Sequence, residues 1–169
     1  MLKKISPFLT LYLSLLLCII LYHVGLQGDF LFDDYPNLEP LGTYGTIDSW
    51  DKVRAFVSSG FAGPTGRPIS LASFLLDANT WPTSPYPFKY TNLLIHLLNG
   101  VLLCWAALLL LRNYNYKEQQ AVWIAILATA FWVLHPYMVS TTLYIVQRMA
   151  QLATLFSLVG IIGYLKARQ

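Results

Sequence analysis

The chain has 169 residues, of which 56% are hydrophobic and only 11% are charged, whereas about 25% of the residues of an average soluble protein are charged. This composition excludes an ordinary soluble domain, and an aromatic content of 15% suits the interfacial belts of membrane proteins. The net charge of +3 forms no basic stripe and accompanies no nucleic-acid-binding motif, so no nucleic acid is expected as a partner.

The first predicted element is an apolar span at about residues 5–26, preceded by Lys3 and Lys4. Its length matches the about 20 residues that cross a bilayer core. A cleaved signal peptide is the alternative. However, its apolar stretch normally covers roughly 7–15 residues, and Gly25, Leu26 and Gln27 make a poor cleavage site. We therefore predict a retained membrane span.

Residues 27–87 form the long polar connection, which Pro, Gly and Ser punctuate throughout. Two short helices are predicted inside it. The first begins near Asp48, which can act as an N-cap, and the second extends from Pro68 to about Asn79, with proline near its start. Both carry apolar side chains, so we expect them to lie at the membrane interface.

Three further spans are predicted at about residues 88–111, 120–138 and 143–165. Four spans place both termini on one side, together with most of the basic flanks, and the positive-inside rule makes that side cytoplasmic. The predicted fold is an all-α membrane protein, a single membrane domain over residues 1–169, with the loop 27–87 outside. The basic residues on the inner side are Lys3, Lys4, Arg112, Lys117, Lys166 and Arg168.

Asp33 and Asp34 follow the first span directly. Two adjacent carboxylates so close to a bilayer are costly unless they meet water, a metal or a cation. We expect both to be catalytic candidates, with the reacting role assigned to Asp34 and an orienting role to Asp33. The cofactor is not defined by the sequence, and a divalent cation on this pair is the candidate.

Polar side chains also recur inside the spans. Asn92, His96 and Asn99 share one helical face, either as interhelical hydrogen-bonding groups or as the lining of a cavity. Arg148, beside Gln147, requires a phosphate or carboxylate partner unless it reaches the headgroups.

His135 and Pro136 end the third span, and His135 is expected to bond the carbonyls that the proline frees. Arg67 precedes Pro68 and is the second candidate ligand for a phosphate, with Arg148 the first. Carboxylates beside arginines at a lipid–water boundary can hold a lipid phosphate while a carboxylate accepts a proton from a hydroxyl.

The order of these motifs resembles the N-terminal part of GT-C-type glycosyltransferases that use polyprenyl-phosphate sugars. It is similar to that of bacterial relatives of the transmembrane O-mannosyltransferases with tetratricopeptide repeats. The resemblance covers essentially the whole chain. The motifs that carry it are Phe32-Asp33-Asp34, Gly66-Arg67-Pro68, Tyr90-Thr91-Asn92 through His96 to Asn99, Leu134-His135-Pro136, and Tyr144 through Gln147-Arg148 to Ala150.

The resemblance implies a polyprenyl-phosphate sugar donor, a protein or glycan acceptor, and a bacterial inner membrane with the site facing the periplasm. It places the acidic motif on Asp33 and Asp34 and the donor phosphate near Arg148. Ser140 stands where relatives often carry an acid, and such enzymes usually have more spans, so a front portion of a larger enzyme is expected. The alternatives are a non-catalytic lipid-binding or scaffold subunit and, third, a small transporter.

Overall fold

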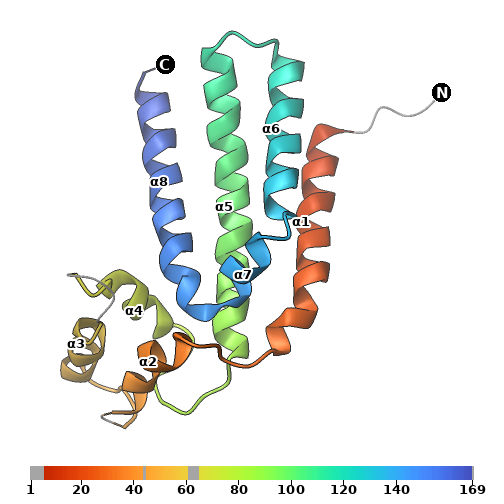
Figure 1. Cartoon of the computed structure of the whole chain (residues 1–169). Helices are drawn as coiled ribbons and strands as arrows, with labels where there is room; N and C mark the ends of the chain where they lie inside the picture. The colour runs from red at the N-terminus through yellow and green to blue at the C-terminus, as the bar shows by residue number, and fades with distance from the viewer. Residues whose placement is uncertain (1–5, 44, 61–64, 169) are drawn as a thin grey trace.

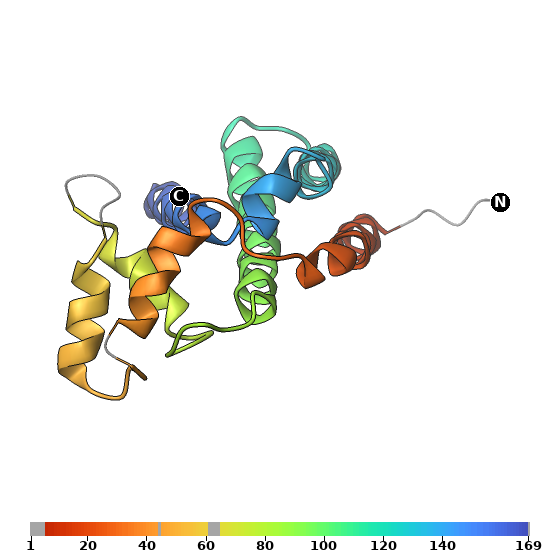
Figure 2. The ribbon, with the colours of Figure 1, turned by 60° about the horizontal axis from the view of Figure 1, so that its bottom comes forward.

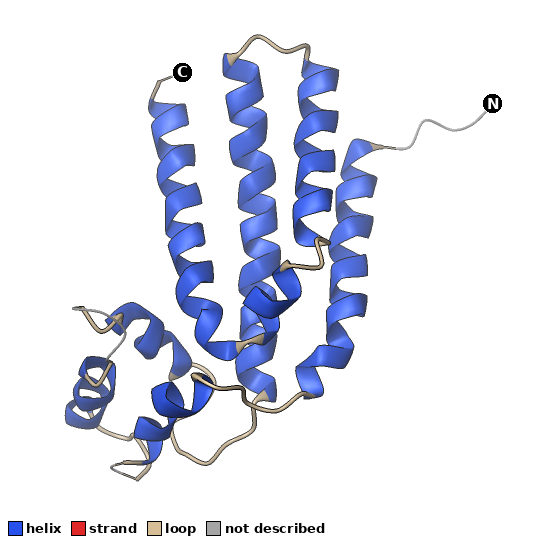
Figure 3. Ribbon diagram, in the orientation of Figure 1, coloured by secondary structure: helices blue, strands red, loops and turns tan. Residues whose placement is uncertain are grey.

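The computed structural model describes residues 6–43, 45–60 and 65–168, and every regular element in these ranges is helical. Four longer helices lie side by side: α1 (Pro7–His23), α5 (Tyr86–Asn113), α6 (Glu118–Val133) and α8 (Arg148–Ala167) (Figures 1 and 3). The α5 helix occupies the middle of this bundle and packs against both α6 and α8. Its central place means that its polar face meets the other helices.

Three segments of the chain are long and apolar enough to cross a membrane: Pro7–Gln27, Tyr86–Asn113 and Ile145–Ala167. They identify an integral membrane protein. The start of α1, the α5–α6 connection and the end of α8 lie at the same end of the bundle, which carries Arg112, Lys117 and Lys166 (Figure 1). Lys3 and Lys4 lie outside the described residues.

The predicted span 120–138 is not one continuous helix, because α6 stops at Val133. Its 16 residues cover only about 24 Å at 1.5 Å per residue, less than the hydrocarbon core of about 30 Å. Pro136 cannot donate a backbone hydrogen bond and clashes with the preceding turn. The chain therefore breaks and starts a separate helix, α7 (Met138–Leu143), followed by η3 (Ile145–Gln147).

A small group of helices lies at one end of the bundle, on the side of α8, and we call it the cap. It comprises α2 (Asp34–Leu38), η2 (Glu39–Gly42), α3 (Trp50–Ser58) and α4 (Pro68–Phe74), which follow the short η1 (Val24–Gln27). Figure 2 shows the cap beside α8 and away from α1. The second predicted loop helix ends at Phe74 instead of continuing to about Asn79.

The cap is folded and is not a solvated linker. Phe56 of α3 and Phe74 of α4 belong to one buried apolar cluster with Phe88 of α5 and Met149 of α8. Burying such side chains contributes about 1.5–3 kcal/mol each. The cluster therefore holds the cap against the ends of the two helices that carry the predicted site.

Candidate functional site

Asp34 is fully buried and connects two distant parts of the chain. Its Oδ2 accepts a hydrogen bond from the Leu31 amide at 2.9 Å, and its Oδ1 accepts one from the Val146 amide at 2.8 Å. Burial raises the pKa of Asp34, while these backbone donors and the nearby Lys89 ammonium oppose the rise. Because each oxygen accepts one backbone hydrogen bond, the Asp34 carboxylate links Leu31, after η1, to Val146 at the start of the last span.

Asp33 is placed differently, because its side chain is exposed. Its backbone amide donates to the Tyr144 hydroxyl at 3.0 Å, so the residue is held in position while its carboxylate faces solvent. Burial, followed by the nearby Asp33 and Asp34 carboxylates, raises the pKa of the Tyr144 hydroxyl. The geometry favours the reverse of the expected assignment: Asp33 is available for chemistry, and Asp34 positions it.

Arg148 has the buried anion partner that the sequence requires, and that partner is Asp77. The Arg148 Nη2 lies 2.6 Å from the Asp77 Oδ2 as an ion pair, and neither side chain is more than 4% exposed. The same guanidinium donates to Asn92 Oδ1 at 2.7 Å and to the backbone oxygens of Ser73 at 2.9 Å and Phe88 at 2.8 Å. A phosphate could reach Arg148 only if these contacts opened.

The polar side chains of α5 form hydrogen bonds with the end of α6, with η3 and with α8. The Asn92 Nδ2 donates to the Ile145 oxygen at 3.2 Å, the His96 Nε2 lies 3.0 Å from the Val133 oxygen, and the Asn99 Nδ2 donates to the Gln151 oxygen at 3.0 Å. Non-helical backbone at membrane depth needs such partners. The interhelical reading is therefore confirmed, and His96 and Asn99 also line a cavity.

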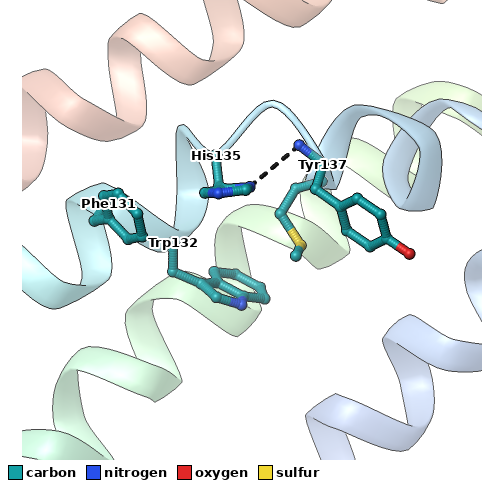
Figure 4. Close-up of a pocket in the computed structure, with 5 residues that line it drawn as sticks. Phe131, Trp132, His135 and Tyr137 are labelled. Carbon is teal, nitrogen blue, oxygen red and sulfur yellow. Dashed lines mark hydrogen bonds between the residues drawn. The ribbon is translucent and has the colours of Figure 1, made fainter.

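From the sequence, His135 is expected to bond a carbonyl that the proline frees. The structure instead shows its Nδ1 accepting a hydrogen bond from the Tyr137 amide at 3.2 Å. An accepting Nδ1 assigns the proton of the neutral ring to Nε2. His135 lines a cavity together with Phe131, Trp132 and Tyr137 (Figure 4). It therefore belongs to the break after α6 and is separate from the Asp33–Asp34 segment.

Arg67 is exposed at the start of α4, in a left-handed conformation with φ of 53°. Its Nη1 lies 3.1 Å from the Met149 sulfur, and no carboxylate pairs with it among residues 6–43, 45–60 and 65–168. Gln147 is half-buried in η3. Of the two arginines proposed from sequence, Arg67 is thus the one with free donors.

The structure brings most of the predicted residues to one segment, Tyr144–Met149. Asp33 contacts Tyr144, Asp34 contacts Val146, and Arg67 contacts Met149. In the described part of the chain, no three His, Cys, Asp or Glu side chains converge as metal ligands. A cation on the Asp33–Asp34 pair would have to displace the backbone donors of Asp34.

Sequence reasoning missed Asp77 and Lys89. The Lys89 ammonium is buried and donates to the backbone oxygens of Gly28 at 2.8 Å and Asp29 at 3.0 Å, which fixes the chain just before the acid pair. A buried arginine signals that some acid must pair with it, but the loop offers several acids and no spacing singles out Asp77.

Comparison with protein-family models, with curated proteins and with solved structures finds no match to this chain. The site therefore has to be interpreted from its own geometry.

Proposed function

We propose that the chain is a membrane glycosyltransferase, or a module of one, which transfers a sugar from a polyprenyl-phosphate donor to a hydroxyl of a protein or glycan. The observation that carries this proposal is the contrast within the acid pair. Both carboxylate oxygens of Asp34 accept backbone hydrogen bonds. The adjacent Asp33 instead has an exposed side chain, and its backbone amide is held by the Tyr144 hydroxyl at the cap end of the bundle. A positioned, solvent-facing base beside a membrane is what such a reaction requires.

In the proposed reaction, the Asp33 carboxylate accepts the proton of the acceptor hydroxyl. The acceptor oxygen forms a bond to the anomeric carbon, the bond from that carbon to the phosphate oxygen breaks, and polyprenyl phosphate leaves. Arg67 is exposed and contacts Met149, at the opposite end of the Tyr144–Met149 segment from the Tyr144 that contacts Asp33, and it holds the phosphate through charge-assisted hydrogen bonds. Arg148 and Asp34 act as positioning residues.

We further propose that α6 and α7 together make a broken fourth crossing. The cap then lies outside, with Asp33 on the periplasmic face of a bacterial inner membrane. The grouping of Arg112, Lys117, Lys166 and Arg168 at the opposite end supports this orientation.

The test uses the purified chain in nanodiscs with undecaprenyl-phosphate hexose labelled in the sugar. Wild-type protein should release the label from the lipid fraction, and Asp33→Asn should lose at least about a hundredfold in rate, the lower range for a general base. Glu39→Gln is the matched control, since Glu39 is another exposed acid of the cap. An unchanged rate in Asp33→Asn would remove the catalytic role of this residue.

A non-catalytic lipid-binding or scaffold subunit is the second candidate, because the most deeply buried charges, Arg148 and Asp34, are both engaged in structural contacts. The same experiment separates the two functions. Binding of undecaprenyl phosphate by the wild-type chain without sugar release supports the subunit, and the absence of both binding and release contradicts both functions.

A further inference from the structure

The break after α6 creates a polar cavity inside the helix bundle. This cavity has a volume of about 210 Å³, and its walls come from α5, α6, α7 and α8. Asn99, Thr141, Gln151 and Thr154 contribute its polar walls. Since Thr154 is exposed, the cavity reaches the lateral surface of the bundle beside α8.

Asn99 and Gln151, which line this cavity, each have a buried amide oxygen without a hydrogen-bond partner within the described ranges. Asn99 and Gln151 are 1% and 3% exposed, and their amide nitrogens are already bonded to the backbone oxygens of Gln151 and Thr141. The Asn99 Oδ1 and Gln151 Oε1 remain unpaired. An unpaired acceptor in a membrane interior is costly, so the site favours a guest that donates hydrogen bonds. The terminal amide torsions are soft, and a small rotation turns these oxygens toward a guest.

The guest is expected to be neutral. None of the seven residues that line the polar cavity is Asp, Glu, Lys or Arg. A phosphate or an ammonium would therefore enter the bundle without a counter-charge, which is unfavourable at membrane depth. A hydroxyl group supplies the required donor without a charge.

A second cavity, also of about 210 Å³, lies next to the first and is apolar. Trp132 and Met138 line both cavities, while Phe131, His135 and Tyr137 complete the second one (Figure 4). Phe131 and Tyr137 are each 72% exposed, so this cavity also reaches the surface. The Met138 side chain between the two is flexible and can move aside. A polar cavity next to an apolar cavity suits an amphiphilic ligand, with its polar group in the first cavity and its hydrocarbon in the second.

From these features we propose that the two cavities bind a neutral hydroxyl-bearing lipid, with the hydroxyl at Asn99 and Gln151 and the hydrocarbon along Trp132 and Met138. This site is separate from Asp33 and does not depend on the proposed transferase. The lipid proposal gives a role to the break after α6, and the transferase proposal assigns no role to that break.

The test compares hexadecanol with its methyl ether, which keeps the chain but cannot donate a hydrogen bond. Affinity is obtained from the rise in unfolding midpoint of the protein in nanodiscs as each compound is added. We expect the alcohol to bind about three- to tenfold more tightly than the ether, the effect of one neutral hydrogen bond. Equal affinities in the wild-type chain would overturn the proposal.

Two variants locate the site. Gln151→Met removes one of the two accepting oxygens and should reduce the preference for the alcohol. Because Gln151 also supports α7, Thr154→Phe provides a test from an exposed position: it should fold normally and lose alcohol binding by closing the opening. Ser157→Phe, on the exposed surface of the same helix, is the matched control and should bind like wild type. Retained alcohol preference in Thr154→Phe would contradict the assigned cavity.

Discussion

Arg148 and Asp77 form a buried ion pair that ties the first turn of α8 to the segment after α4, with 2.6 Å between Nη2 and Oδ2. The Asp77 carboxylate also accepts a hydrogen bond from Thr91 of α5. The pair therefore joins the cap to two helices of the bundle. Because the guanidinium lies between Phe74 and Phe88, it has little access to water that could replace a lost partner.

Asp77→Asn should destabilise the protein by about 3–5 kcal/mol, because it leaves the Arg148 charge buried without a counter-charge. The measurement is the unfolding free energy in detergent. Glu118→Gln is the control, since it interrupts the exposed Arg112–Glu118 ion pair and should change little. A loss in Asp77→Asn no larger than in Glu118→Gln would show that Asp77 does not hold Arg148.

The two arginines proposed as phosphate ligands should behave differently. Arg67→Ala should weaken the binding of undecaprenyl phosphate by roughly ten- to a hundredfold, the effect of losing one charge-assisted hydrogen bond of about 1.5–3 kcal/mol. Arg148→Lys should instead lower the unfolding free energy, because lysine cannot reproduce the contacts of the planar guanidinium. Affinity measured on folded protein separates these effects. Weaker binding in Arg148→Lys with unchanged stability would return the phosphate role to Arg148.

Asp34→Asn should cost about 1–3 kcal/mol, because an amide cannot accept both backbone hydrogen bonds. The pH dependence follows from the raised pKa of Asp34. The raised pKa means that the folded protein binds the Asp34 proton more tightly than the unfolded chain does. Protonation therefore adds to the free energy of unfolding. This contribution is fully present below the ordinary pKa of aspartate and is lost as the pH rises through the pKa of Asp34 in the folded protein.

The stability margin of wild type over Asp34→Asn should therefore grow as the pH is lowered from 7 toward 4. Unfolding midpoints of both proteins in the same detergent, measured across this range, provide the check. A margin that shrinks on acidification would mean that the backbone donors and Lys89 outweigh burial.

The long apolar helices could be predicted from sequence because their signal is local: length and composition alone decide whether a helix can span a bilayer. The break after α6 also has a local signal, since Pro136 cannot continue a helix, but only the chain geometry shows that the Val133 oxygen at the end of α6 meets His96. The role of Asp34 was equally hidden. Adjacent acids look alike in sequence, and only the Val146 amide, 112 residues away, distinguishes them.

The number of crossings is decided by the side on which residue 168 lies. The first turn of α8 contacts the cap, and its last turn lies at the end of the bundle that carries the α5–α6 connection. Labelling of residue 168 therefore tests whether the chain crosses back through α6 and α7. Single cysteines at exposed positions report each location: Asp51→Cys in the cap, Gln119→Cys at the start of α6, and Arg168→Cys after α8.

We expect a membrane-impermeant maleimide to label positions 119 and 168 from the same side and position 51 from the other, in right-side-out and inverted vesicles. The parent chain is the control, because Cys18 is buried and Cys104 is half-buried within α5. A broken crossing is feasible here because Asn92 and His96 bond the backbone oxygens of Ile145 and Val133 at the break. Labelling of positions 168 and 51 from one side would contradict both the fourth crossing through α6 and α7 and the placement of the end of α8 beside the α5–α6 connection.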